Sequence, residues 1–316
     1  MHYWRMALAI LLQPLAYFIV AWEWQLLLRP SGHLPLVKAM QAVFAGRFTN
    51  DVMPFQTGYL VRAYLASRWM GSGFGAVVPS LVVERLWEGV WLVSGIGALA
   101  VVVPLPDYLL LARNILAFVM LAGIGLVLLM ILRRRLGLVR RIHKTFSRWK
   151  PGRNALCIID RVVDGVRRIG TSRLLPAILG LSILKLAIQA LAFLALMWAY
   201  GLKLSVWSGL AVFLIAYLGI CIPSTPASAG VFQLFSITGL SAFGISKEEA
   251  TGFSLVAFVA WTLPMAIIGF FALAQSGMTL RKIQNAEFES EAERPGDSSI
   301  GFSSATPMSK DESCGV

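Results

Sequence analysis

The chain has 316 residues, of which 57% are hydrophobic and only 14% are charged. A soluble domain usually carries about a quarter charged residues, so this composition excludes an ordinary soluble enzyme. The net charge of +12 would suit a nucleic-acid-binding protein, but nearly all of it comes from the segment 133–173, which holds thirteen Lys and Arg against two Asp. Basic segments beside membrane spans typically mark the cytoplasmic side, so we expect no nucleic-acid partner.

Three long stretches contain no Asp, Glu, Lys or Arg, namely 114–132, 204–246 and 250–280. A membrane-spanning helix needs roughly 20 apolar residues, so each stretch can supply at least one crossing. The sequence therefore predicts an all-α fold, a polytopic transmembrane helix bundle with about six to eight crossings. We expect the protein in the cell membrane, inner or plasma.

Hydrophobic segments separated by polar or Pro/Gly-containing stretches divide the chain into a first transmembrane half, 1–132, and a second, 174–279. In chain order the predicted segments are 6–28, 36–48, 59–69, 75–103 and 109–132, then 174–200, 204–222, 231–243 and 251–275. Breaks are expected at 49–58 and 223–230. Each half thus has a long span, a short segment, a break, a short segment and a long span.

The segment between the halves, 133–173, is predicted to be a basic cytoplasmic loop. Apolar residues recur at helical spacing within 136–149 and 154–170, which is typical of amphipathic helices on an anionic membrane surface. A solvated linker is the alternative interpretation. Residues 280–316 are polar and Ser-rich, and we expect a disordered tail because they cannot bury enough apolar surface to fold.

The two breaks share a pattern, because Pro54-Phe-Gln-Thr-Gly58 and Pro226-Ala-Ser-Ala-Gly230 occupy the same place in the two halves. Short hydrophobic segments with Pro/Gly interruptions at corresponding positions are typical of a transporter's binding site. Interrupted helices expose backbone polar groups, which are tolerated in a membrane only inside protein or beside a polar cavity. We therefore predict two pseudo-repeated re-entrant segments whose helix ends hold a phosphate, with a purely structural turn as the alternative.

Ionisable side chains gather near the first break and in the span that follows it. The candidates are Arg47, Asn50, Asp51 and Arg62 around the break, and Glu84, Arg85 and Glu88 in the span. Glu84 and Glu88 are four residues apart and share one helix face. Charges within a span usually pair or face a cavity, so we predict that Arg62 or Arg47 pairs with Glu84 or Glu88, as a structural ion pair or as substrate contacts.

Two further charged residues lie in predicted spans. Lys185 sits in the middle of its span with Gln189 one turn on, and is either the counter-ion of a buried carboxylate or an anion ligand. Glu23 lies between Trp22 and Trp24, and we expect it at the membrane interface. The three Cys and three His are scattered, so we predict no metal site and no cofactor. No catalytic residue is expected, because nucleophile and base do not occur at a recognisable spacing.

Three stretches resemble one known family of membrane proteins. They are Gly46-Arg-Phe-Thr-Asn50-Asp-Val-Met-Pro54 through Gly58 and Arg62, Val82-Val-Glu84-Arg85-Leu, and Ile222-Pro223-Ser-Thr-Pro226-Ala-Ser-Ala-Gly230-Val-Phe-Gln233. Together, over about positions 5 to 276, they resemble the lysylphosphatidylglycerol synthase transmembrane-region family of flippase-like proteins. The resemblance implies re-entrant breaks near a central cavity and movement of an anionic, aminoacylated or glycosylated lipid between leaflets.

Two positions depart from the family's pattern. Relatives often carry Glu directly after the first-break Gly, where this chain has Tyr59, and three residues after the second-break Gly, where it has Gln233. The loss of both carboxylates argues against a cation-coupled step and against an aminoacylated head group.

The favoured function is a lipid or lipid-linked glycan translocator. The alternatives are an integral-membrane transferase acting on a lipid or polyprenyl substrate, and a non-catalytic scaffold for a lipid or glycan biosynthetic complex. The expected partners are membrane lipids and a lipid or glycan biosynthetic enzyme. The predicted substrate-binding residues are Asn50, Asp51, Pro54, Gly58, Arg62, Glu84, Arg85, Glu88, Lys185, Pro223, Pro226, Gly230 and Gln233. Among them, Arg62 and Arg85 are the predicted phosphate contacts, and Lys185 is a secondary anion site.

Overall fold

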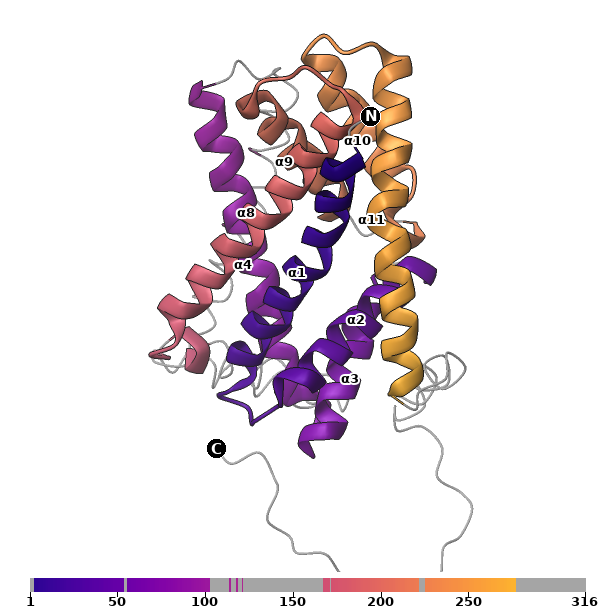
Figure 1. Ribbon diagram of the computed structural model, residues 1–316. Helices are drawn as coiled ribbons and strands as arrows, with labels where there is room; N and C mark the ends of the chain where they lie inside the picture. Colours follow the sequence, from indigo (N-terminus) through magenta and orange to yellow (C-terminus); the bar gives the residue numbers. More distant parts are fainter. Residues whose placement is uncertain are drawn as a thin grey trace, which may run out of the picture.

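The computed structural model describes residues 3–53, 56–102, 167–170, 172–221 and 225–276, with Asn114, Phe118 and Leu121. Within these residues the protein is helical and has no strand (Figure 1). The elements are α1 (Tyr3–Leu28), α2 (Leu36–Val52), α3 (Gly58–Met70), α4 (Phe74–Val102), α8 (Leu175–Tyr200), α9 (Val206–Cys221), the short 3₁₀ helix η1 (Pro226–Ser228), α10 (Val231–Ala242) and α11 (Lys247–Gln275). The rest of the predicted span at 109–132, residues 133–166 of the basic loop and the tail lie outside the described residues.

Four helices, α1, α4, α8 and α11, are long and apolar enough to cross a membrane, and α9 is a shorter apolar helix. Large apolar side chains on α11, including Leu255, Val259, Leu263 and Phe270, point outward and are more than half exposed. Such side chains are stable on an outer surface when lipid surrounds it. The predicted all-α transmembrane bundle is therefore confirmed, whereas the total number of crossings and the re-entrant course of the short helices stay predictions.

Two helix ends differ from the prediction by four residues, and side-chain hydrogen bonds explain both. α2 continues to Val52 because the Thr49 hydroxyl donates a hydrogen bond to the carbonyl of Ala45, one turn earlier in the helix. The N–H of Met53 still donates to the carbonyl of Thr49 at 2.7 Å. α11 begins one turn early, at Lys247, because Ser246 accepts a hydrogen bond from the N–H of Glu249. Acidic residues in the first turn stabilise this end of the helix, because they interact favourably with the positive end of the helix dipole.

The two halves, α1–α4 and α8–α11, repeat each other in length as well as in order. Their helices have 26, 17, 13 and 29 residues in the first half, and 26, 16, 12 and 29 in the second. In Figure 1, α1 and α11 descend from the top of the bundle, whereas α8 and α4 rise toward it. Equivalent long helices are thus antiparallel, which is the arrangement of an inverted repeat.

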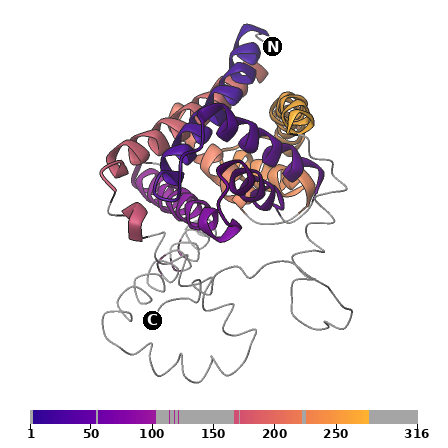
Figure 2. The same cartoon turned by 90° about the horizontal axis from the view of Figure 1, so that it is seen from below.

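The halves interlock, because the last long helix of each packs on the first short helix of the other. On α11, Gly269 meets the backbone of α2, where an added Cβ would lie 2.5 Å from the carbonyl oxygen of Phe44. On α4, Gly95 meets Leu214 of α9, 3.0 Å from such a Cβ. Figure 2 shows α11 nearly end-on beside α2. Glycine at both crossings lets the helices approach closely, as small residues do at membrane helix interfaces.

Substitution of Gly269 by Ala should lower the free energy of unfolding by about 2 kcal/mol, since the new methyl group meets a backbone oxygen that cannot move without the whole helix. Gly97→Ala is the matched control, because nothing lies within 4 Å of a Cβ at that position of α4. Thermal unfolding of the purified proteins in detergent checks the difference. Equal stability of the two variants would contradict this packing.

Candidate functional site

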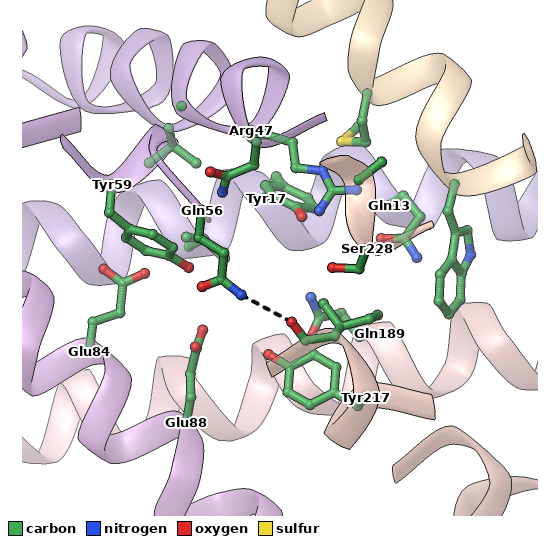
Figure 3. Close-up of a pocket in the computed structure, with 18 of the residues that line it drawn as sticks. Gln13, Tyr17, Arg47, Gln56, Tyr59, Glu84, Glu88, Gln189, Tyr217 and Ser228 are labelled. Carbon is green, nitrogen blue, oxygen red and sulfur yellow. Dashed lines mark hydrogen bonds between the residues drawn. The ribbon is translucent and has the colours of Figure 1, made fainter. Parts of the chain in front are cut away.

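A polar cavity of about 140 Å³ lies between the two halves (Figure 3). Both breaks reach it, through Gln56 from the first and through Thr225, Ala227 and Ser228 from the second. The remaining lining residues are Gln13, Tyr17 and Val20 of α1, Val43, Gly46, Arg47 and Asn50 of α2, Tyr59 and Arg62 of α3, Glu84, Arg85 and Glu88 of α4, Gln189 of α8, Phe213, Tyr217 and Ile220 of α9, and Trp261 and Met265 of α11.

The cavity lies at mid-length of the four long helices. Tyr17 follows the first residue of α1 by 14 positions, and Glu88, Gln189 and Trp261 follow the first residues of α4, α8 and α11 by the same number. At 1.5 Å per residue, these side chains lie roughly 21 Å along their helices. A helix that spans the bilayer reaches the middle of the hydrocarbon layer at about this point.

The two halves line the cavity at equivalent positions but with different chemistry. All five charged residues of the lining belong to the first half, namely Arg47, Arg62, Glu84, Arg85 and Glu88. The described lining of the second half carries no charge, and its polar groups are amide, hydroxyl and indole. The backbone therefore repeats around the cavity, while the electrostatics are concentrated on one side.

One buried ion pair joins α3 to α4. The two terminal nitrogens of Arg62 donate to the two carboxylate oxygens of Glu84 at 3.0 and 2.8 Å. The guanidinium carbon lies 4.4 Å from the ring centre of Trp24, whose indole N–H donates to Ser80 Oγ at 3.0 Å. Such bidentate pairing is the strong form of the Arg–carboxylate contact. The predicted pairing of an arginine at the first break with a glutamate of the next span is confirmed.

A second ionic network joins α1, α4 and α8. Lys185 contacts Glu23 at 3.0 Å and Glu88 at 3.4 Å, and Glu88 also accepts from Arg85 at 2.8 Å. Ser182 donates to Glu23. Of the two interpretations of Lys185, the counter-ion is the one observed. The interfacial placement of Glu23 was wrong, because antiparallel packing of α1 on α8 buries the carboxylate, which is 1% exposed, against the lysine.

Both breaks contain the same local backbone distortion. Gln56 and Ser228 are the third residues of the two five-residue motifs, and each has a left-handed φ of 55°. Such residues cost free energy and persist only where their surroundings hold them. Gln56 is held on both sides, since its amide oxygen accepts from Arg85 at 2.7 Å and its amide nitrogen donates to Ile220 O, at the end of α9, at 3.2 Å.

At the end of each break, a side chain from a neighbouring helix residue accepts a hydrogen bond from the N–H of the glycine. Asn50 Oδ1 accepts from the N–H of Gly58 at 2.7 Å and so caps α3 across the first break, from a position inside α2 rather than in the break. Gln233 Oε1 accepts from the N–H of Gly230 at 2.7 Å and does the same for α10. Gly58 packs against the carbonyl of Gly46, where a Cβ would have no room.

The structure brings some of the predicted site residues to the cavity and not others. Those that line it are Asn50, Arg62, Glu84, Arg85 and Glu88. Those that lie behind or beside it are Asp51, Gly58, Lys185, Pro226, Gly230 and Gln233. Pro54 and Pro223 lie outside the described residues. Asp51 pairs with Arg47 at 3.0 Å, and the substrate contacts themselves stay a prediction.

The sequence interpretation missed most of the neutral polar lining. The residues that it did not select are Gln13, Tyr17, Gln56, Tyr59, Tyr217, Ser228 and Trp261. The 14-residue offset shared by Tyr17, Glu88, Gln189 and Trp261 is counted from the observed first residues of their helices, so the predicted segment bounds did not reveal it. The Tyr59 ring centre lies 5.5 and 4.2 Å from the guanidinium carbons of Arg62 and Arg85.

The inverted halves and the internal polar cavity define a class, that of polytopic membrane proteins with a site enclosed between two repeats. Residues 1–269 match the family model described as the lysylphosphatidylglycerol synthase TM region, so the chain belongs to this family and the resemblance is confirmed. No curated protein and no solved structure matches the chain. The family indicates an integral membrane protein concerned with lipids.

Replacing Glu84 by Gln should lower the free energy of unfolding by about 3–5 kcal/mol, because Arg62 is then left buried and unpaired. In the double variant Glu84→Gln/Arg62→Met no charge remains unpaired, so it should unfold at a higher temperature than the single variant. Thermal unfolding in detergent measures both. A double variant that is less stable than the single one would show that the arginine is not held in place by this pair.

Proposed function

We propose that the protein moves a polar-headed membrane lipid between the two leaflets, with the head group inside the cavity and the acyl chains in the surrounding lipid. The observation that carries this proposal is a cavity with charged and polar walls at mid-length of helices that are otherwise apolar. A polar or charged head group meets a high free-energy barrier in hydrocarbon. Fixed polar groups at this depth lower that barrier.

The inverted repeat supports movement rather than static binding. In transporters built this way, the site lies at the interface of the repeats, and rocking of one repeat against the other exposes it to either side. Here the interlocked pairs, α4 on α9 and α11 on α2, occupy equivalent places in the two halves, and α11 packs on α2 far more extensively than α4 packs on α9. If their geometries interchange, the cavity opens toward the opposite leaflet.

Exposure separates the roles of the two arginines predicted to contact phosphate. The side chain of Arg85 is 34% exposed, whereas that of Arg62 is 6% exposed and both of its terminal nitrogens are bonded to Glu84. We therefore propose Arg85 as a head-group contact on the path and Arg62 as a positioning residue for α3. Asn50, Glu84 and Glu88 complete the proposed path on the charged side of the cavity.

Reconstitution into liposomes that contain fluorescent phosphatidylglycerol tests the movement, with and without a proton gradient. We expect dithionite to bleach lipid that began in the inner leaflet, and Arg85→Gln to slow this exchange by about tenfold, the value of one hydrogen bond to a charged group. Arg68→Gln is the control, because Arg68 lies exposed at the end of α3. If the vesicles with protein behave like empty ones under both conditions, the translocation proposal fails.

We also propose that the basic loop, 133–173, faces the cytoplasm in a multi-pass cell-membrane protein, where its charge attracts anionic lipid. The loop carries Cys157, which serves as a natural probe. With Cys221→Ala and Cys314→Ser in place, a membrane-impermeant maleimide should label Cys157 in inside-out vesicles and leave it unlabelled in intact cells. The reverse pattern would place the loop outside.

A further inference from the structure

We infer that the acidic segment 287–297 of the C-terminal tail binds the end of the bundle at which α1 and α11 end and α2 and α8 begin. This end, the basic end, is defined by Arg29, Lys38 and Arg173. The contact is ionic and lies within one chain. It concerns the outer surface of the protein, so it does not depend on what the cavity between the two halves binds.

The three cations come from different elements that meet at the basic end. Arg29 follows α1 directly and Arg173 lies just before α8, and both side chains are exposed. α1 and α8 pack antiparallel, so the end of α1 lies beside the start of α8. The connection 29–35 then leads to α2, where Lys38 lies in the first turn. Segments that are far apart in the sequence thus place their positive charges on one surface.

The described residues supply no carboxylate to the basic end. Four of their carboxylates are paired with cations inside the bundle, namely Glu23, Asp51, Glu84 and Glu88. The other two, Glu248 and Glu249, lie in the first turn of α11, at the opposite end of that helix. Within the described part of the chain, Arg29 and Arg173 therefore have no ionic partner. A surface with charge of one sign attracts a partner of the opposite sign.

α11 ends at the basic end, so the tail begins there. Gln41, in the second turn of α2, donates from its amide nitrogen to the carbonyl of Ala272, in the last turn of α11, at 3.2 Å. Figure 1 shows α11 ending beside α2 at the lower end of the bundle. Lys38 donates to the amide oxygen of the same Gln41 at 3.2 Å and lies 4.7 Å from the ring centre of Trp69. Both of these contacts are to uncharged groups, so the positive charge of Lys38 is not neutralised by them.

The segment 287–297 holds most of the negative charge of the tail. Against Arg294 it carries Glu287, Glu289, Glu291, Glu293 and Asp297. The four glutamates occupy alternate positions, and an extended chain turns alternate side chains to the same side. Glu287 follows Gln275, the last residue of α11, by 12 positions. A chain of this length spans at most roughly 40 Å, so the glutamates can reach the cations of the basic end.

Tethering favours the tail over a free anionic partner. A short link gives the segment an effective concentration of about a millimolar at the basic end, so even a weak ionic contact is populated. Anionic lipid head groups attract the same cations, but they repel the carboxylates of the tail. The tail and the lipid therefore compete for the basic end. The tail has the advantage of being attached beside it.

Pulsed electron paramagnetic resonance on the full chain measures this contact as a distance. One spin label is attached to His33→Cys, in the exposed connection at the basic end, and the other to Ser290→Cys, in the acidic segment. The natural thiols are removed by Cys157→Ser, Cys221→Ala and Cys314→Ser. Excess unlabelled protein restricts the signal to pairs within one chain. In uncharged detergent at about 0.1 M salt we expect a short component in the label separation, which is lost at about 1 M salt, where the Debye length is about 3 Å.

Charge variants assign the contact to its two sides. Replacing the four glutamates of the segment by Gln should remove the short component, and so should Arg29→Glu/Arg173→Glu. Combining this reversed surface with Glu→Lys at the same four tail positions should restore it, because the charges are exchanged and remain complementary. Lys203→Glu is the matched control, since Lys203 is an exposed cation between α8 and α9, at the opposite end of α8. This variant should keep the short component.

Three outcomes would overturn the inference. The first is a broad distribution of long separations in uncharged detergent at low salt. The second is a short component that survives both the tail variant and the surface variant, because the contact would then not be ionic. The third is a short component that disappears when the protein is placed in nanodiscs with anionic lipid. In that case the basic end binds lipid in the membrane, and the tail does not occupy it.

Discussion

The pairing of charge in an apolar interior is the constraint on which the rest of this structure depends. A lysine or a glutamate left alone at the depth of Lys185 and Glu23 would cost more free energy than a helix contact returns. The ionic network of Lys185 therefore fixes α8 against α1 and α4, and the pair of Arg62 and Glu84 fixes α3 against α4. These contacts hold Arg62 of α3 and the charged residues of α4, Glu84, Arg85 and Glu88, at the wall of the cavity.

The repeated backbone and the unrepeated chemistry have different physical origins. Helix lengths, glycine crossings and left-handed break residues recur in both halves because each half must solve the same packing problem. Side chains at equivalent positions, such as Glu88 and Trp261, differ because their partners differ: Glu88 pairs with Arg85 and Lys185, whereas Trp261 packs on Phe193 and Phe232. The result is a chamber with an ionic side and a neutral side, which can orient a ligand that a symmetric chamber could not.

The sequence predicted the features whose causes are local or thermodynamic. The length of the apolar stretches predicted the long helices, and the Pro-x-x-x-Gly motifs predicted the breaks. The free-energy cost of buried charge predicted the pairing of an arginine at the first break, Arg62, with Glu84. Glu23 was misplaced because its tryptophan neighbours are a local signal, while the lysine that buries it comes from the other half. The end of α2 was misjudged because Asn50, a polar residue typical of loops, remains helical and caps α3. Tyr17 and Trp261 look like ordinary residues of a span until the fold turns them toward one cavity.

The side chain of Gln56 has a mechanical consequence. Its amide oxygen accepts from Arg85 in the first half, and its amide nitrogen donates to the carbonyl of Ile220, in the last turn of α9, in the second. Because the amide group is planar and rigid, it cannot rotate to keep one of these two hydrogen bonds when the partner of the other moves away. Gln56 therefore links the first break directly to the end of α9, the helix that precedes the second break, so a displacement of one segment relative to the other strains one of these two bonds.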